Sequence, residues 1–319
     1  MPKQRLIWLV ILFFILIIAG GGLIFYYTIS ERPPNFQWTF GTFGVKPGDL
    51  YNPVGIAIDK EDNIYTTDSG NNRTQKFSPS GKPITIWGEK GSEKGQFNTP
   101  FGILIDNEEL FVSDNKNHRI QKFTTQGLFK TEFGSLGAGA GQLHHPAQLA
   151  IDREGVIYVA DTYNHRIVKF DKDGNFKGVW GEEGSGLGQL NTPWGIAIDS
   201  TGTIYVADTE NNRIQKFSND GKIITSWGFV GSNPGEFKHP TFLFIDKLDF
   251  LYVVDEGNNR IQKFSKRGEF IYQWGKEGNG NGQFSNPRGI TGDNNDNLFI
   301  ADSGNHRIEI FRIVRKGKL

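Results

Sequence analysis

A carboxylate and a guanidinium recur together six times along this chain, always five positions apart. A ring of carboxylates could bind a metal ion or act in acid–base catalysis. Sixfold repetition favours a structural role instead, because a single active site does not need six copies. Opposite charges that flank a four-residue loop can pair across the base of a hairpin. We therefore predict six structural pairs: Asp68 with Arg73, Asp114 with Arg119, Asp161 with Arg166, Asp208 with Arg213, Asp255 with Arg260, and Asp302 with Arg307.

The six histidines fall in loops that we expect to lie on one face of the fold. Histidine is the commonest metal ligand in proteins. His145 and His239 occupy the same repeat position, directly before a proline, and a third equivalent position holds Asn52 instead. We keep a metal site at His145 and His239 as a hypothesis, with ordinary loop polarity as the alternative. The remaining histidines are His118, His144, His165 and His306.

A second group of candidate residues stands where the repeats differ from one another. The residue after each repeat proline varies from alanine to tryptophan to arginine, so packing does not dictate it. Aromatic side chains with a few polar groups are typical of a ligand or peptide pocket. The alternative is that these side chains plug a central channel. The candidate binding residues are Phe101, Trp194 and Arg288 directly after a proline, Gln148 and Phe242 one position later, and Tyr163 in a short loop.

The motifs of several enzyme classes are absent from the sequence. The glycine-rich segments 134–141 and 278–282 precede a proline and a further predicted strand. A phosphate-binding loop would instead precede a helix. The chain contains neither a G-x-S-x-G elbow nor an H-E-x-x-H zinc motif. We therefore expect no cofactor, and a binding protein rather than an enzyme.

The elements that position these residues come from a repeated stretch. Residues 193–217 have counterparts that begin at Pro53, Pro100, Pro146, Pro240 and Pro287, at spacings of 46 or 47 residues. Each copy predicts four short strands separated by Gly, Asn, Asp or Ser turns. Such a sheet cannot bury both faces alone, so neighbouring sheets must pack together. Six sheets that pack radially form a six-bladed β-propeller of four-stranded antiparallel blades, an all-β fold.

The ends of the chain indicate how the ring closes. The last copy ends at Phe311 after its third strand, and residues 312–319 form a basic tail. Residues 36–41 match the fourth strand of the other copies. We therefore predict that residues 36–41 complete the sixth blade, which removes an open sheet edge. The propeller domain then spans residues 36–319.

The N-terminal segment predicts a membrane anchor. Residues 6–29 contain no charged side chain, and about 20 apolar residues suffice for a transmembrane helix. Lys3 and Arg5 precede the segment, so the positive-inside rule places residues 1–5 in the cytoplasm and the propeller outside. A cleaved signal peptide that leaves a secreted protein is the alternative. Residues 30–35 form a short linker, and the expected location is the cell membrane as a single-pass protein.

Composition narrows the possible partners. The chain has no cysteine, which excludes disulfides, cysteine-ligated zinc and cysteine nucleophiles. Basic and acidic residues balance at 35 each, whereas a nucleic-acid binder usually has a basic excess. We therefore expect no nucleic-acid partner. The expected partners are the membrane, through residues 6–29, and a protein, peptide or glycan ligand on the propeller.

The repeat resembles a known family. The motif N-H-R-I stands at residues 117–120 and 305–308, N-H-R-I-V at 164–168, and N-N-R-I at 211–214 and 258–261. With the surrounding pattern, the segment 36–311 closely resembles NHL repeats. The resemblance implies a sensor or interaction module, and related folds include lyases. We thus expect a membrane-anchored binding or scaffolding propeller, with a metal-dependent lyase or hydrolase acting at the axial face as the alternative.

Overall fold

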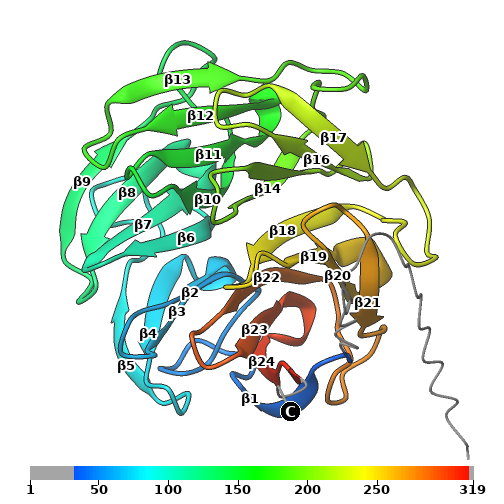
Figure 1. The fold of residues 1–319 in the computed structure, drawn as a ribbon. Coiled ribbons are helices and arrows are strands. Elements are labelled where there is room, and N and C mark those ends of the chain that lie inside the picture. Colours follow the sequence, from blue (N-terminus) through cyan, green and yellow to red (C-terminus); the bar gives the residue numbers. More distant parts are fainter. Residues whose placement is uncertain (1–31, 316–319) are drawn as a thin grey trace, which may run out of the picture. The chain divides into compact units, whose positions relative to one another are not determined.

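The computed structural model describes residues 32–315, which form six four-stranded antiparallel sheets arranged as the blades of a propeller (Figure 1). The all-β fold predicted from the repeat is therefore confirmed. Blade 1 consists of β2 (Pro53–Ile58), β3 (Ile64–Asp68), β4 (Arg73–Phe77) and β5 (Pro83–Trp87). Blade 2 consists of β6 (Pro100–Asp106), β7 (Glu109–Asp114), β8 (Arg119–Thr124) and β9 (Phe129–Phe133). Blade 3 consists of β10 (Pro146–Ile151), β11 (Ile157–Asp161), β12 (Arg166–Phe170) and β13 (Phe176–Trp180).

The second half of the ring repeats this order. Blade 4 consists of β14 (Pro193–Ile198), β15 (Ile204–Asp208), β16 (Arg213–Phe217) and β17 (Ile223–Trp227). Blade 5 consists of β18 (Pro240–Ile245), β19 (Leu251–Asp255), β20 (Arg260–Phe264) and β21 (Phe270–Trp274). Blade 6 consists of β22 (Pro287–Gly292), β23 (Asn297–Asp302), β24 (Arg307–Arg312) and β1 (Asn35–Phe40).

One face of the propeller carries the connections between the second and third strands and between successive blades, and we call it the loop face. In five blades the connection between the second and third strands includes a short 3-10 turn. These turns are η1 (Ser69–Asn71), η2 (Asn115–Asn117), η3 (Thr162–Asn164), η4 (Glu256–Asn258) and η5 (Ser303–Asn305). The long connections between blades are residues 41–52, 88–99, 134–145, 181–192, 228–239 and 275–286.

Sheet pairing closes the ring at blade 6, where the first and last strands of the chain meet. The strand expected at residues 36–41 lies at Asn35–Phe40 and pairs antiparallel with β24, with Phe40 opposite Ile308. A side-chain bond across the same seam joins the Ser303 hydroxyl to the Pro53 carbonyl of blade 1. Four other blades make the equivalent bond to the next blade. The ring is thus closed both by strand pairing and by the inter-blade bonds.

The hydrophobic core lies between neighbouring blades, because each sheet buries its faces against the next one. Between blades 4 and 5, for example, Tyr205 and Ala207 pack in one cluster with Leu243 and Val253. The inner strands approach each other closely at one glycine in four of the six blades, Gly55, Gly102, Gly195 and Gly289. A Cβ atom at Gly195 would overlap the backbone oxygen of Thr241, so this position favours glycine.

The membrane segment predicted at residues 6–29 lies outside the described residues, as do residues 1–5. Within residues 32–315, no helix is long and apolar enough to cross a bilayer.

The closure of blade 6 can be tested by truncation. Deletion of residues 1–41 removes β1 and leaves an unpaired edge on β24, whereas deletion of residues 1–34 keeps this pairing. We expect the longer deletion to lower the melting temperature by more than about 10 °C relative to the shorter one. Thermal unfolding followed by circular dichroism measures the difference, and equal melting temperatures would show that β1 is dispensable.

Candidate functional site

A hydrogen bond between adjacent blades recurs six times on the loop face and involves three of the histidines. Its acceptor is the side chain that follows the turn between the second and third strands. Its donor is the backbone N–H 27 residues later in five copies, and in the sixth it is the Asn52 N–H, across the closure of the ring. The acceptor is His Nδ1 in three copies and Asn Oδ1 in the other three, at 2.8–3.2 Å. We call this bond the latch; its acceptors are Asn72, His118, His165, Asn212, Asn259 and His306.

The latch fixes the tautomer of its histidines. A ring nitrogen that accepts a hydrogen bond cannot carry a proton, so the neutral ring of His118 carries its proton on Nε2. The residue also stands in the left-handed region, with a φ of 57°. Histidine and asparagine both tolerate this conformation and both offer an acceptor. Their exchange among the six copies therefore follows from the latch alone.

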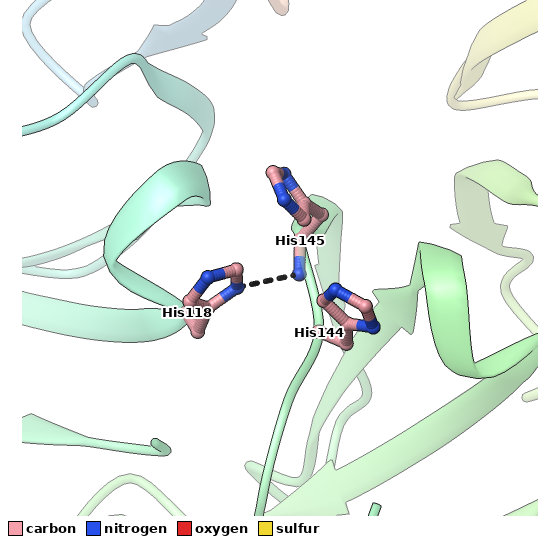
Figure 2. Close-up of side chains that lie close together, drawn as sticks. All are labelled: His118, His144 and His145. Carbon is pink, nitrogen blue, oxygen red and sulfur yellow. Dashed lines mark hydrogen bonds between the residues drawn. The ribbon is translucent and has the colours of Figure 1, made fainter. Parts of the chain in front are cut away.

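Three histidines meet where the latch joins blade 2 to blade 3 (Figure 2). One ring nitrogen from each of His118, His144 and His145 lies within 4.8 Å of the others. His118 follows η2, while His144 and His145 end the long connection into β10. The Tyr163 ring on η3 packs on His145 at a centroid distance of 4.8 Å and on His144 at 5.4 Å. We call these four residues the histidine cluster.

His145 presents a free lone pair within this cluster. Its Nδ1 lies 2.8 Å from Asn115 Oδ1, and Asn115 Nδ2 donates to the Pro146 carbonyl at 3.0 Å. The second bond orients the amide, so His145 Nδ1 is the donor and Nε2 keeps its lone pair. Burial, followed by the nearby His118, His144 and Lys116, lowers the pKa of His145 to about 4. Burial and His144 also lower the pKa of His118.

The lowered pKa of His145 has a consequence for stability. A neutral ring persists at pH 7, where Nε2 can act as a hydrogen-bond acceptor or metal ligand. The folded protein binds this proton more weakly than the unfolded chain. Its contribution to stability is therefore fully present above about pH 6.5 and is lost as the pH falls towards about 4.

The other predicted metal ligand, His239, lies apart from this cluster. Its Nε2 is 3.8 Å from the Glu210 carboxylate, and its backbone N–H donates to the Asn212 latch at 2.9 Å. His145 and His239 share a repeat position, but the structure groups His145 with residues of the adjacent blade. Only the blade 2–3 seam has histidine both as the latch acceptor and at the residue that donates to it. Two histidines 27 residues apart, His118 and His145, are therefore the sequence feature that identifies the cluster.

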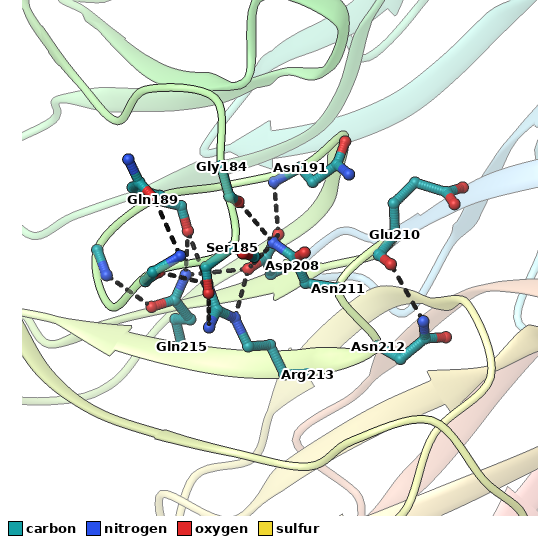
Figure 3. Close-up of polar contacts among 12 residues, drawn as sticks. Gly184, Ser185, Gln189, Asn191, Asp208, Glu210, Asn211, Asn212, Arg213 and Gln215 are labelled. Carbon is teal, nitrogen blue, oxygen red and sulfur yellow. Dashed lines mark hydrogen bonds and ion pairs between the residues drawn. The ribbon is translucent and has the colours of Figure 1, made fainter.

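The six Asp–Arg pairs form buried networks, which blade 4 illustrates (Figure 3). Asp208 is fully buried, and its Oδ1 accepts the Asn191 N–H at 2.6 Å. Its Oδ2 accepts Arg213 Nε at 2.6 Å and Gln215 Nε2 at 3.0 Å. Asn211 Nδ2 donates to both carboxylate oxygens. All six Asp–Arg distances lie between 2.6 and 2.9 Å.

The arginine of each network also holds the long connection into its own blade. In blade 4, Arg213 donates to the carbonyls of Ser185, Gly186 and Gln189 at 2.7–2.9 Å. Burial raises the pKa of Asp114, Asp161, Asp255 and Asp302, although the hydrogen bonds that they accept act in the opposite direction. These groups are occupied within the fold, so they offer little to a substrate.

The residues after the repeat prolines meet around the channel axis. The Phe101 ring lies 5.3 Å from Trp194 and 5.8 Å from Phe242. Phe101 and Phe242 are only 5% and 3% exposed, so they fill the channel and present little surface. The Arg288 guanidinium lies 5.5 Å from the Trp194 ring and forms an ion pair with Glu256 at 3.1 Å. Trp194 and Arg288 remain partly exposed and form what we call the channel mouth.

Gln148 crosses the channel beneath these rings. Its Oε1 accepts the N–H groups of Ile196 and Leu243, at 3.0 and 2.9 Å, and its Nε2 donates to the Leu243 carbonyl. This side chain therefore ties the inner strands of blades 3, 4 and 5 together. A cavity of about 240 Å³ follows towards the opposite face, lined mainly by aliphatic residues of the inner strands. Tyr163, 49% exposed, belongs to the histidine cluster and not to the mouth.

A known repeat family matches four of the six repeats. The NHL repeat model matches residues 50–77, 143–170, 190–217 and 284–311. These segments are NHL repeats. No curated protein matches the chain at a significant level.

Solved structures similar to this propeller include enzymes. A streptogramin B lyase matches with a TM-score of 0.58 and 17% identity, over 81% of this chain and 78% of that one. The virginiamycin B lyase of Staphylococcus aureus matches with a TM-score of 0.60 and 14% identity, over 82% of this chain and 95% of that one. A gluconolactonase of Xanthomonas campestris matches with a TM-score of 0.64 and 14% identity, over 90% of this chain and 96% of that one. At these identities the similarity shows a common fold.

The latch and the histidine cluster can be separated by substitution. His118→Asn keeps an acceptor of the kind found at Asn72, so the melting temperature should change by less than about 2 °C. The same variant removes one imidazole beside His145, whose pKa should rise but stay below the ordinary value because burial remains. NMR titration of the His145 ring measures the shift. His118→Ala is the control that loses the latch, and equal destabilisation by both variants would contradict this role.

Proposed function

We propose that this NHL propeller is a membrane-anchored binding module that takes a protein, peptide or glycan ligand on its loop face. The observation that carries the proposal is the contrast between repeated and non-repeated side chains. The repeated Asp and Arg groups are occupied in buried networks, as Asp208 illustrates. The partly exposed aromatic and cationic groups on this face stand at positions where the repeats differ.

The channel mouth supplies the first part of the proposed surface. The Arg288 guanidinium lies over the Trp194 ring, and the Phe101 ring meets the tryptophan edge to face. Buried aromatic and arginine side chains are the usual anchors of binding energy at interfaces. Glu256 holds the arginine in place through its ion pair. The mouth thus offers a preorganised aromatic and cationic contact.

The histidine cluster supplies the second part. The exposed Tyr163 ring offers a stacking surface, and His145 Nε2 offers an acceptor beside it. An aromatic face next to polar groups suits a peptide side chain or a sugar ring. This surface and the mouth lie on the same loop face and could contact one extended ligand.

Membrane anchoring through residues 6–29 is part of the proposal, and the lack of charged side chains in this segment supports it. Phe40, at the end of β1, pairs with Ile308 near the loop face, whereas Asn35 pairs with Arg312 at the other end of the strand. The chain therefore enters the propeller from the face opposite the loop face. The N-terminal end of β1 therefore lies away from the proposed binding surface.

Binding at the mouth predicts a specific mutational pattern. Trp194→Ala and Arg288→Ala should each weaken partner binding by about 30-fold, which corresponds to about 2 kcal/mol. Their melting temperatures should stay within a few degrees of the wild type, because these residues lie on loop-face positions. Photo-crosslinking on intact cells with the full-length protein, followed by titration of the identified partner, measures the effect.

The control for this experiment is Trp227→Ala. Trp227 packs on Tyr205 and Phe264 at the blade edge, so its loss should lower stability and leave binding per folded molecule unchanged. Protease added to the intact cells should abolish crosslinking, in keeping with a propeller outside the membrane. If Trp194→Ala unfolds the protein while binding per folded molecule is retained, the residue only plugs the channel.

A metal-dependent lyase or hydrolase is the second candidate function, and the histidine cluster favours it. Metal-ligating histidines typically donate their second ring nitrogen to a fixed acceptor, as His145 does to Asn115. His144 and His145 could therefore supply two ligands. His118 already uses Nδ1 in the latch, so it would join only after a change of tautomer and loss of this bond. Such a metal would polarise a carbonyl or activate water.

Metal analysis separates the two functions. If the cluster is a metal centre, the protein should bind about one equivalent of Zn²⁺ by isothermal titration calorimetry. The His144→Ala/His145→Ala double variant should lose this binding, whereas the matched control His239→Ala should retain it. Binding that survives in the double variant, or no stoichiometric binding in the wild type, would remove the metal-dependent enzyme from consideration.

A further inference from the structure

One position of the buried Asp network carries an ionisable side chain in blade 6 only. The second residue after the network arginine is glutamine in four blades, at Gln75, Gln121, Gln215 and Gln262. Blade 3 has Val168 at this position, and blade 6 has Glu309. The glutamines and Glu309 are fully buried, so their hydrogen-bonding patterns can be compared directly.

The glutamine has three partners in every blade that contains it. Its Nε2 donates to the network aspartate at 3.0–3.1 Å and to a carbonyl of the long connection at 2.5–2.7 Å. Its Oε1 accepts a glycine N–H from the same connection at 2.8–3.1 Å. This position thus requires one atom that accepts a hydrogen bond and one atom that donates two, and the glutamine amide supplies both.

Glu309 retains only the acceptor half of this pattern. Its Oε2 accepts the Gly282 N–H at 3.1 Å, as the glutamine oxygen does in other blades. The donor nitrogen is replaced by Oε1, which lies 2.6 Å from Arg307 Nη2. Arg307 Nε is already bonded to Asp302 at 2.8 Å. A carboxylate can donate the missing hydrogen bond only when it carries a proton.

The charged groups that act on Glu309 are few and can be named. Burial raises its pKa to about 7, Arg307 on the same strand lowers it, and Asp302 on β23 raises it. The Gly282 N–H also lowers it. Thr39, the partner of Glu309 on β1, brings no charge. Two carboxylates therefore share one guanidinium in a dry environment, which favours protonation of one of them.

We propose that Glu309 is a proton-operated switch in the blade that closes the ring. In the protonated form Glu309 donates one of the two hydrogen bonds that the glutamine nitrogen donates elsewhere, and it keeps the bond from Gly282 that holds β24 to the connection 275–286. In the ionised form it loses the donated bond and leaves a second negative charge beside Asp302. Because β24 pairs directly with β1, the switch acts on the strand that the N-terminal segment enters. Blade 6 is thus more stable against local unfolding in acid than in mildly alkaline solution.

The direction of the pH dependence follows from linkage. The folded protein binds the Glu309 proton more tightly than the unfolded chain does. The contribution to stability is therefore fully present below about pH 4.5 and falls as the pH rises to about 7. Above that range both states are ionised, and the contribution changes no further. This trend is opposite in sign to that of a salt-bridged carboxylate.

The variant Glu309→Gln tests the switch by installing the residue that four other blades use. At pH 8 its melting temperature should exceed that of the wild type by at least about 3 °C. At pH 5 the two proteins should melt within about 1 °C, because protonated Glu309 is uncharged and regains a hydrogen-bond donor at this position. Amide hydrogen exchange of β1 and β24, compared between the two proteins at each pH, should show the same difference. The other buried carboxylates are common to both proteins and cancel.

The matched control introduces the same carboxylate in blade 5. Gln262→Glu should lower the melting temperature at pH 8 and recover most of it at pH 5, because Gln262 has the standard three partners. The proposal is overturned if Glu309→Gln melts below the wild type at pH 8, since Glu309 would then stabilise the blade as an ionised partner of Arg307. A difference that is the same at pH 5 and pH 8 also overturns it.

Discussion

The fold depends on a buried aspartate at the end of the second strand of every blade. This carboxylate accepts a backbone N–H from the long connection, an asparagine from the turn and the arginine that begins the third strand. A buried charge is tolerated only when it is paired and hydrogen-bonded, so the surrounding residues must be present together. In the motif N-[HN]-R-I, the first asparagine and the arginine therefore donate hydrogen bonds to one carboxylate. The residue between them is the latch acceptor that bonds to the next blade.

The repeated polar side chains are bonded to one another in these networks. Side chains that could contact a ligand are therefore expected at positions where the repeats differ in sequence. Blades 3 and 6, opposite each other in the ring, carry several such changes. Blade 3 has Gln148 in place of the inner glycine and Val168 in place of the network glutamine. Blade 6 has Glu309 and Arg288. Each change keeps the strand pairing of its blade and alters what the side chains offer, as expected for function added to a common scaffold.

The sequence predicted the repeated features well and the contacts between repeats poorly. Strand positions and the closing strand followed from spacing, with the latter shifted by one residue to Asn35–Phe40. The histidine cluster was missed because His118 and His145 hold different repeat positions, and a 27-residue offset across the blade seam brings them together. The burial of Phe101 and Phe242 was likewise left open, because it depends on side chains from several blades that meet on the axis.

The latch explains why His145 and His239 do not meet although they hold the same repeat position. Positions that are equivalent in two repeats are separated by whole blades, so only residues on the axis can meet their counterparts. His145 and His239 precede the innermost strands but point to the seams, where each one meets the preceding blade. Residues that meet at a seam come from non-equivalent positions of adjacent repeats. In this propeller, side chains that cluster away from the axis are therefore found by comparing the turn residue of one repeat with the residue 27 positions later, in the next repeat.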